Sequence, residues 1–197
     1  MASPVSPLAA EALRVNARYV EEVVIGWDLC PWAAHAWRAG EVERRVFEEA
    51  RPDPRTVATF VQELAPHDRC AVALAIFPRA ESSVGGWERF AEAVRRLGGP
   101  FLVAAFHPHY RASDEPVADA AQLVSLIRRT PDPTLQLVRA ARIESLAAGR
   151  RDVSAEIAAA NYATVTSRDP ARLAALLDEL RRDRDRAYAS LSQPPLG

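Results

Sequence analysis

Two apolar runs separated by an amphipathic segment constrain the fold of this chain more than any other feature. Residues 70–77 (CAVALAIF) and 101–106 (FLVAAF) are apolar throughout, which is typical of central strands buried on both faces. Residues 42–48 (VERRVFE) alternate apolar and charged side chains, as an edge strand with one solvated face does. One helical segment between each pair of strands makes a βαβαβ unit. We therefore predict an α/β fold with a short, mainly parallel three-stranded sheet, packed by several helices and with a helical C-terminal half.

Helix starts are marked where proline follows Ser or Asp, because proline favours the first helical position and Ser or Asp favours the cap before it. Four such pairs each precede an amphipathic segment: Ser6-Pro7, Asp53-Pro54, Asp132-Pro133 and Asp169-Pro170. Further helices are predicted at about 84–97, 117–129 and 154–163. We expect one globular domain over residues 1–190 and a frayed tail at 191–197.

The composition excludes several classes of function. The net charge of −1 argues against a nucleic-acid or anionic-membrane partner. All 25 basic residues are arginine, which excludes a lysine Schiff base and a P-loop lysine. Two cysteines do not make a disulfide framework, and neither a signal peptide nor a membrane span is evident. We expect a cytoplasmic protein with reduced thiols.

His107 and His109 follow the buried run 101–106 directly, and Pro108 between them ends the strand. The carboxyl ends of strands in α/β sheets are where ligand crevices open, so this position predicts a site that also includes Tyr110. The pair His107 and His109 has three interpretations: metal binding, acid–base work or hydrogen bonding to a ligand without metal, and a structural role.

Cys30 is the second candidate, in the segment GWDLCPWAAHAW at residues 26–37. If Gly26 ends one helix and Pro31 begins the next, Cys30 is the N-cap, where free amides and the helix dipole lower a thiol pKa. Cys30 is then a nucleophile, a redox thiol or a metal ligand, and the alternative is a small buried residue among tryptophans. Together with His107 and His109 it would form a three-ligand site for one zinc or iron ion.

The third candidate is the segment RRTPDPTLQLVR at residues 128–139. We expect a turn at its prolines and a new helix capped by Asp132, with Gln136 and Arg139 on one face. Arg129 and Arg139, with Gln136, would then bind an anionic group of a small molecule, because a guanidinium pairs with both oxygens of a carboxylate or phosphate. A solvated charged face is the alternative.

Three short motifs together resemble a bacterial domain family of about 180 residues whose function is unknown. They are LCPWA (29–33), FHPHY (106–110) and RTPDPTLQLVR (129–139), which match an LCP-aromatic-Ala, an FHP-x-Tyr and an Arg-x-Pro-x-Pro-x-Leu-x-Leu-x-Arg pattern. The resemblance covers roughly residues 10–185. The chain departs from the pattern at His109, where the family has an acidic or polar residue, and at Gln136, where a histidine is common. The resemblance implies that the three segments belong to one site, and it supplies no activity.

Two functions therefore remain open. The first is a small-molecule enzyme in which Cys30, His107 and Tyr110 are catalytic and Arg139 holds an anionic group. The second is a non-catalytic module that binds a ligand or a metal ion. Haem binding through Cys30-Pro31 is a third, weaker interpretation. No GxGxxG, GxxxxGK[ST], HExxH, CxxC or GxSxG motif supports the common cofactor and hydrolase classes.

Overall fold

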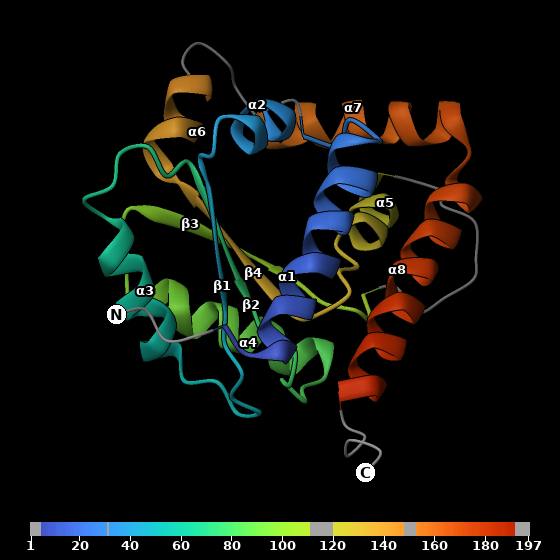
Figure 1. Cartoon of the computed structure of the whole chain (residues 1–197). Helices are drawn as coiled ribbons and strands as arrows, with labels where there is room; N and C mark the ends of the chain where they lie inside the picture. The colour runs from blue at the N-terminus through green and yellow to red at the C-terminus, as the bar shows by residue number, and fades with distance from the viewer. Residues whose placement is uncertain (1–4, 31, 111–119, 148–152, 192–197) are drawn as a thin grey trace.

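The computed structural model describes residues 5–30, 32–110, 120–147 and 153–191 (Figure 1). The N-terminal half comprises α1 (Pro7–Arg18), the π-helix η1 (Tyr19–Ile25), α2 (Ala33–Arg38), β1 (Val42–Val46), α3 (Pro54–Leu64), β2 (Val72–Ile76) and α4 (Val84–Arg96). The C-terminal half comprises β3 (Phe101–Phe106), α5 (Ala120–Ile127), β4 (Thr134–Arg139), α6 (Ala140–Ala147), α7 (Val153–Arg168) and α8 (Pro170–Leu191). The α/β class and the helical C-terminal half agree with the prediction.

In the part of the chain that the structure describes, the sheet is mixed and four-stranded, so the prediction of a mainly parallel three-stranded sheet was wrong. Its order is β1-β2-β4-β3. β1 and β2 pair in parallel, whereas β4 is antiparallel to both of its neighbours. The three predicted strands exist and run in one direction, but β4 lies between the second and the third. β1 is an edge strand whose residues alternate between half-buried and exposed, as predicted.

β4 occupies part of the segment for which the sequence predicted a helix beginning at Asp132. Two features override that signal. Pro131 and Pro133 keep the residues before them out of the helical region, and the Pro133 carbonyl accepts a hydrogen bond from the Phe77 amide at 2.9 Å. Leu135 and Leu137 are fully buried at alternate positions, which suits a strand paired on both sides. Gln136 and Arg139 consequently lie on opposite faces of the sheet, not on one face of a helix.

β3 lies at the edge of the sheet, so the prediction that it is a central strand was wrong. Leu102 is 53% exposed on this strand. Arg95 of α4 donates through Nε to the Val103 carbonyl at 3.1 Å, so a side chain satisfies one acceptor that an added strand would otherwise pair.

Three of the four proline-marked helix starts are confirmed. Ser6 accepts from the Ala9 amide at 3.0 Å, and Asp53 accepts from the Arg55 amide at 2.9 Å. Asp169 caps α8 in the same way through the Ala171 amide. The predicted helix at 117–129 corresponds to α5, and residues 117–119 lie outside the described part. The helix predicted at 154–163 is longer in the structure, where it is α7.

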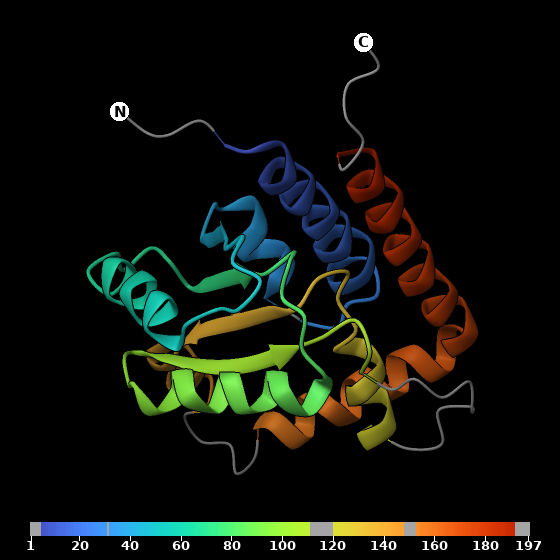
Figure 2. The same ribbon diagram turned by 90° about the horizontal axis from the view of Figure 1, so that it is seen from below.

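Helices cover both faces of the sheet and create two apolar cores (Figure 2). On one face, α3 and α4 pack on the alternate side chains Ala73, Ala75, Leu135 and Leu137 of the central strands. On the other face, Leu74 and Ile76 contact a layer formed by α1, η1, α5, α7 and α8. No helix within the described ranges is long and apolar enough to span a bilayer.

The first helix changes to π-helical geometry at Tyr19, which is uncommon and frequently accompanies functional sites. Gly26 ends this segment. A Cβ atom at Gly26 would lie 2.4 Å from the Glu22 carbonyl oxygen, so no larger residue fits without moving the backbone. The wide turn is therefore specified by a close approach that only glycine allows.

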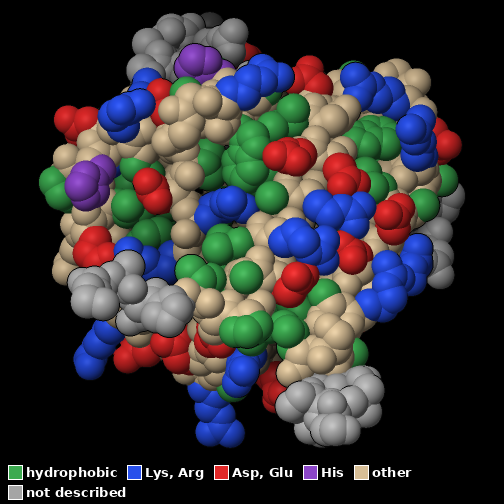
Figure 3. Space-filling view, viewed as in Figure 1, with side chains coloured by type: hydrophobic (Ala, Val, Ile, Leu, Met, Phe, Trp, Pro, Cys, Tyr) green, Lys and Arg blue, Asp and Glu red, His purple; other side chains and the backbone are tan. Residues whose placement is uncertain are grey.

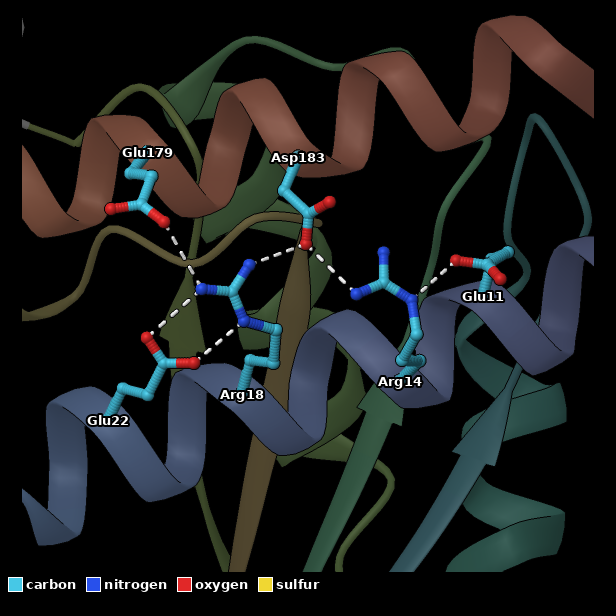
Figure 4. A network of polar contacts seen from close by, with 6 residues as sticks. All are labelled: Glu11, Arg14, Arg18, Glu22, Glu179 and Asp183. Atoms are coloured by element: carbon cyan, nitrogen blue, oxygen red, sulfur yellow. Dashed lines mark hydrogen bonds and ion pairs between the residues drawn. The ribbon is translucent and has the colours of Figure 1, made fainter.

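An ion-pair network joins α1 to α8 (Figure 4). Asp183 of α8 accepts from Arg14 at 2.9 Å and from Arg18 at 2.6 Å, and these contacts hold the pKa of Asp183 below its usual value. Arg18 also pairs with Glu22 and Glu179. Figure 3 shows acidic and basic side chains mixed on this face of the molecule. Partly exposed pairs of this kind contribute modestly one by one, and here several of them connect α8 to the first helix.

Candidate functional site

A cavity of about 560 Å³ lies between the sheet and the helical layer of its second face. Its floor is formed by strand residues that point to this face, among them Val42, Val72, Leu74, Phe106, Gln136 and Val138. Apolar side chains also dominate its walls, including Val20, Val24, Leu29, Val124, Ile127 and Ile143. Volume and lining are those of a site for a small organic molecule.

Several polar groups interrupt the apolar lining, and most of their donors are already engaged. The Tyr19 hydroxyl donates to the Ile127 carbonyl at 2.8 Å. Thr130 and Thr134 both donate to the Asp132 carbonyl, at 2.7 and 2.9 Å. The carboxamides of Asn16 and Asn161 are buried in the same lining.

Charged groups lie in the same lining. Glu41 and Arg142 both line the cavity and face one another at 4.0 Å, and Arg128 lines it as well. The cavity therefore combines apolar surface with a few polar and charged groups, which is the usual composition of a specific ligand site.

Cys30 lies at this cavity, as does His35 of α2. The chain reaches Cys30 through a left-handed turn at Asp28, whose φ is 53°. The next helix begins at Ala33 and has Trp32 as its N-cap, so Cys30 is not the N-cap that the sequence predicted; Pro31 lies outside the described residues. Burial raises the pKa of the Cys30 thiol, although hydrogen bonds from the Trp32 and Ala33 amides act in the opposite direction. The predicted lowering of this pKa was wrong because burial outweighs those two amides.

His107 lies away from the cavity, and both of its ring nitrogens are hydrogen-bonded. Its Nε2 lies 3.0 Å from the Ser82 carbonyl, to which it must donate, and its Nδ1 accepts from the His109 amide at 3.2 Å. The side chain is 2% exposed, and burial lowers its pKa. A neutral imidazole with one donated and one accepted hydrogen bond connects the end of β3 to the loop before α4.

His109 and Tyr110 point to different partners. The His109 Nδ1 lies 3.4 Å from an Arg181 nitrogen. Burial lowers the pKa of His109, and the positive charge of Arg181 lowers it further. The Tyr110 hydroxyl donates to the Glu88 carboxylate. Neither residue lines the cavity that holds Cys30.

Of the three polar residues predicted in the segment 128–139, only Gln136 lines the cavity. Arg129 pairs with Asp178 of α8 at 2.5 Å. Arg139 lies on the opposite face of the sheet, where its guanidinium donates to the carbonyls of Leu64, Ala65, His67 and Cys70 at 2.9–3.3 Å. Arg139 thus binds backbone carbonyls at the end of α3 and in the segment that follows it, instead of facing the cavity.

The structure does not bring the predicted metal ligands Cys30, His107 and His109 together. Within the described ranges, no three His, Cys, Asp or Glu side chains gather as metal ligands would. Of the residues predicted to converge, Cys30 and Gln136 share the cavity, whereas His107, His109, Tyr110, Arg129 and Arg139 lie elsewhere.

Sequence reasoning missed Asn16, although a signal was present. Ala12, Val15 and Tyr19 form the buried stripe of the first helix, and Asn16 lies within that stripe. A polar residue at a core position of an amphipathic helix needs a partner, and this requirement could have marked the residue. The placement of Asn161 on α7 carries no comparable pattern, because that helix has a weak apolar face.

Comparison with known proteins places the chain in one family. No curated protein and no solved structure matches it. The family model described as "Protein of unknown function (DUF1415)" matches residues 11–175, which lie within the range of about 10–185 expected from the resemblance to a family of unknown function. The matched range includes the four strands and all of the described residues that line the cavity. The chain therefore belongs to the DUF1415 family of proteins of unknown function.

Proposed function

We propose that this protein binds a small, mainly apolar organic molecule in the cavity between the sheet and the helical layer of its second face. The cavity itself carries the proposal: about 560 Å³ lined by apolar side chains with a few polar groups among them. An anionic group on that molecule would be placed beside Arg128 or Arg142, the arginines of the lining. Arg139 takes no part, because its guanidinium is engaged with backbone carbonyls.

The fluorescent anion 8-anilinonaphthalene-1-sulfonate tests this proposal, because it joins an apolar ring system to a negative charge. We expect one molecule to bind per chain, and we expect Val138→Trp, which fills the cavity floor, to weaken binding at least ~10-fold. Fluorescence titration measures both.

Leu102→Trp is the matched control for this titration. Leu102 pairs with Val138 across the β3–β4 ladder, but it is exposed and does not line the cavity. Its variant should bind the probe like the wild type. Equal binding by the wild type and Val138→Trp would place the probe elsewhere and contradict the proposal.

A thiol-dependent enzyme acting on the same molecule is the second candidate. One observation favours it: the Cys30 sulfur lies at the cavity with the amides of Trp32 and Ala33 directed at it. Such amides stabilise a thiolate or an anion formed next to it. His35 would be the acid–base group of this enzyme, because it lines the cavity and His107 does not.

Alkylation by iodoacetamide separates the two candidates. Since burial raises the pKa of Cys30, we expect its reaction at pH 7 to be slower than that of free cysteine and to accelerate as the pH rises. Saturation with the fluorescent anion should slow it further. Mass spectrometry of the wild type and of Cys30→Ser, which retains Cys70, assigns the label. Reaction faster than free cysteine at pH 7 would instead favour the enzyme.

A further inference from the structure

Asn16 is the most unusual polar residue of the cavity lining. It is 5% exposed, and its Oδ1 has no hydrogen-bond donor in the described part of the chain. An unsatisfied acceptor at a buried position is costly, typically by about 1–3 kcal/mol, so native proteins rarely keep one without a reason.

Among the described residues of the lining, no hydroxyl group donates to this acceptor. The hydroxyl protons of Tyr19, Thr130 and Thr134 are each donated to a backbone carbonyl. Rotating any of them toward Asn16 would break an existing bond. A donor carried by a molecule bound in the cavity would satisfy this oxygen.

The helix that carries Asn16 has a second unusual feature. It changes to π-helical geometry at Tyr19, three residues after Asn16, and asparagine is itself a weak helix former. Tyr19, Val20 and Val24 of that π-helix line the same cavity. Local violations of sequence rules concentrate at functional sites, and here two of them adjoin one cavity.

We infer that Asn16 is the polar anchor of the cavity, and that the bound molecule carries a hydroxyl or N–H group that hydrogen-bonds to the Asn16 carboxamide. This inference rests on the proposed function and narrows it to apolar molecules with one such donor, namely phenols, alcohols or amides. If the carboxamide is turned by 180°, its NH₂ group takes the place of the oxygen, and the ligand group must then accept. A hydroxyl or an amide satisfies either arrangement, whereas a hydrocarbon satisfies neither.

Three probes of similar shape test the inference by calorimetric titration. They are 2-naphthol, which has a hydroxyl, 2-methoxynaphthalene, whose ether oxygen accepts but cannot donate, and 2-methylnaphthalene, which does neither. We expect the wild type to bind 2-naphthol about 10-fold more tightly than 2-methylnaphthalene, the effect of one buried hydrogen bond. The methoxy compound should bind as weakly as the hydrocarbon where Asn16 presents its oxygen, and more tightly than the hydrocarbon where the carboxamide is turned and its NH₂ group donates.

Asn16→Leu should remove this preference, and 2-methylnaphthalene should then bind at least as tightly as 2-naphthol. The variant should also raise the melting temperature of the unliganded protein by about 2–4 °C, because an apolar side chain replaces an unsatisfied polar one. A merely structural asparagine would instead lower it. Asn161→Leu, which changes the other buried carboxamide of the lining, is the matched control and should keep the preference.

The possible outcomes test the role of Asn16 and the proposed function separately. Equal binding of 2-naphthol and 2-methylnaphthalene by the wild type would overturn the role of Asn16 and leave the cavity as a binding site. Loss of the preference in Asn161→Leu with its retention in Asn16→Leu would overturn the assignment to Asn16. Failure of all three probes and of the fluorescent anion to bind would overturn the proposed function itself.

Discussion

Replacing Arg184 by methionine should lower the free energy of unfolding by about 3 kcal/mol, because it leaves a buried carboxylate without its cation. Asp132 is 3% exposed; its Oδ1 accepts from Arg184 Nε at 2.8 Å, and its Oδ2 accepts from the Tyr188 hydroxyl at 2.6 Å. Arg184 also donates to the Pro78 carbonyl at 2.8 Å, so one side chain of α8 holds two loops at the end of the sheet. Urea unfolding of the variant and the wild type measures the difference.

The stability lost in Arg184→Met should depend on pH, and this dependence provides an internal check. Burial raises the pKa of Asp132 while Arg184 lowers it, so removing Arg184 raises the folded-state pKa further above the unfolded value. A raised folded pKa means that the native state holds the proton more tightly, and its stability then increases as the pH falls through that pKa. The deficit should therefore shrink at acidic pH. Arg182→Met, an exposed change on the same helix, should have little effect, and an equally small effect of Arg184→Met would refute the argument.

His107→Ala is expected to destabilise the protein by about 3 kcal/mol. The substitution removes the hydrogen bonds to the Ser82 carbonyl and the His109 amide, and it leaves a void where a ring was almost fully buried. A loss of stability of this size is expected for a structural residue, because removing a catalytic side chain often leaves the stability unchanged or increases it. Thermal unfolding at pH 7 gives the sign directly.

Cys30→Ala should destabilise the protein much less than His107→Ala does. Cys30 is half-buried at a cavity, so its truncation should cost less than about 1 kcal/mol. If His107→Ala instead leaves the melting temperature unchanged and Cys30→Ala lowers it, the roles that the geometry supports for the two residues are reversed.

Much of the fold could be predicted because its signals are local. Ser6, Asp53 and Asp169 mark helix starts through a bond to an amide two or three residues away, and such bonds do not depend on the rest of the molecule. The apolar runs 70–77 and 101–106 likewise identify strands. β4 could not be found in this way. The Asp132-Pro133 pair is typical of a helix start, but in the structure the Asp132 carboxylate accepts a hydrogen bond from Arg184, which lies 52 residues away.

The candidate site was predicted less well than the fold because it depends on which face each side chain occupies. A helix over 132–139 would place Gln136 and Arg139 together, whereas the strand separates them across the sheet. His107 was correctly expected at the end of a strand, but only the structure reveals that Ser82 and His109 occupy both of its nitrogens. The unsatisfied oxygen of Asn16 depends on the absence of a donor, which a sequence does not display.

The position of β4 also has a consequence for how the protein is made. One of the two central strands of the sheet is the last strand to be synthesised, because β4 ends at Arg139 while its partners β2 and β3 end at Ile76 and Phe106. Until β4 emerges from the ribosome, β2 and β3 have no partner along the edges that β4 will occupy. Open, apolar strand edges recruit other chains, so this interval is when the nascent protein is most prone to aggregation and most in need of a chaperone.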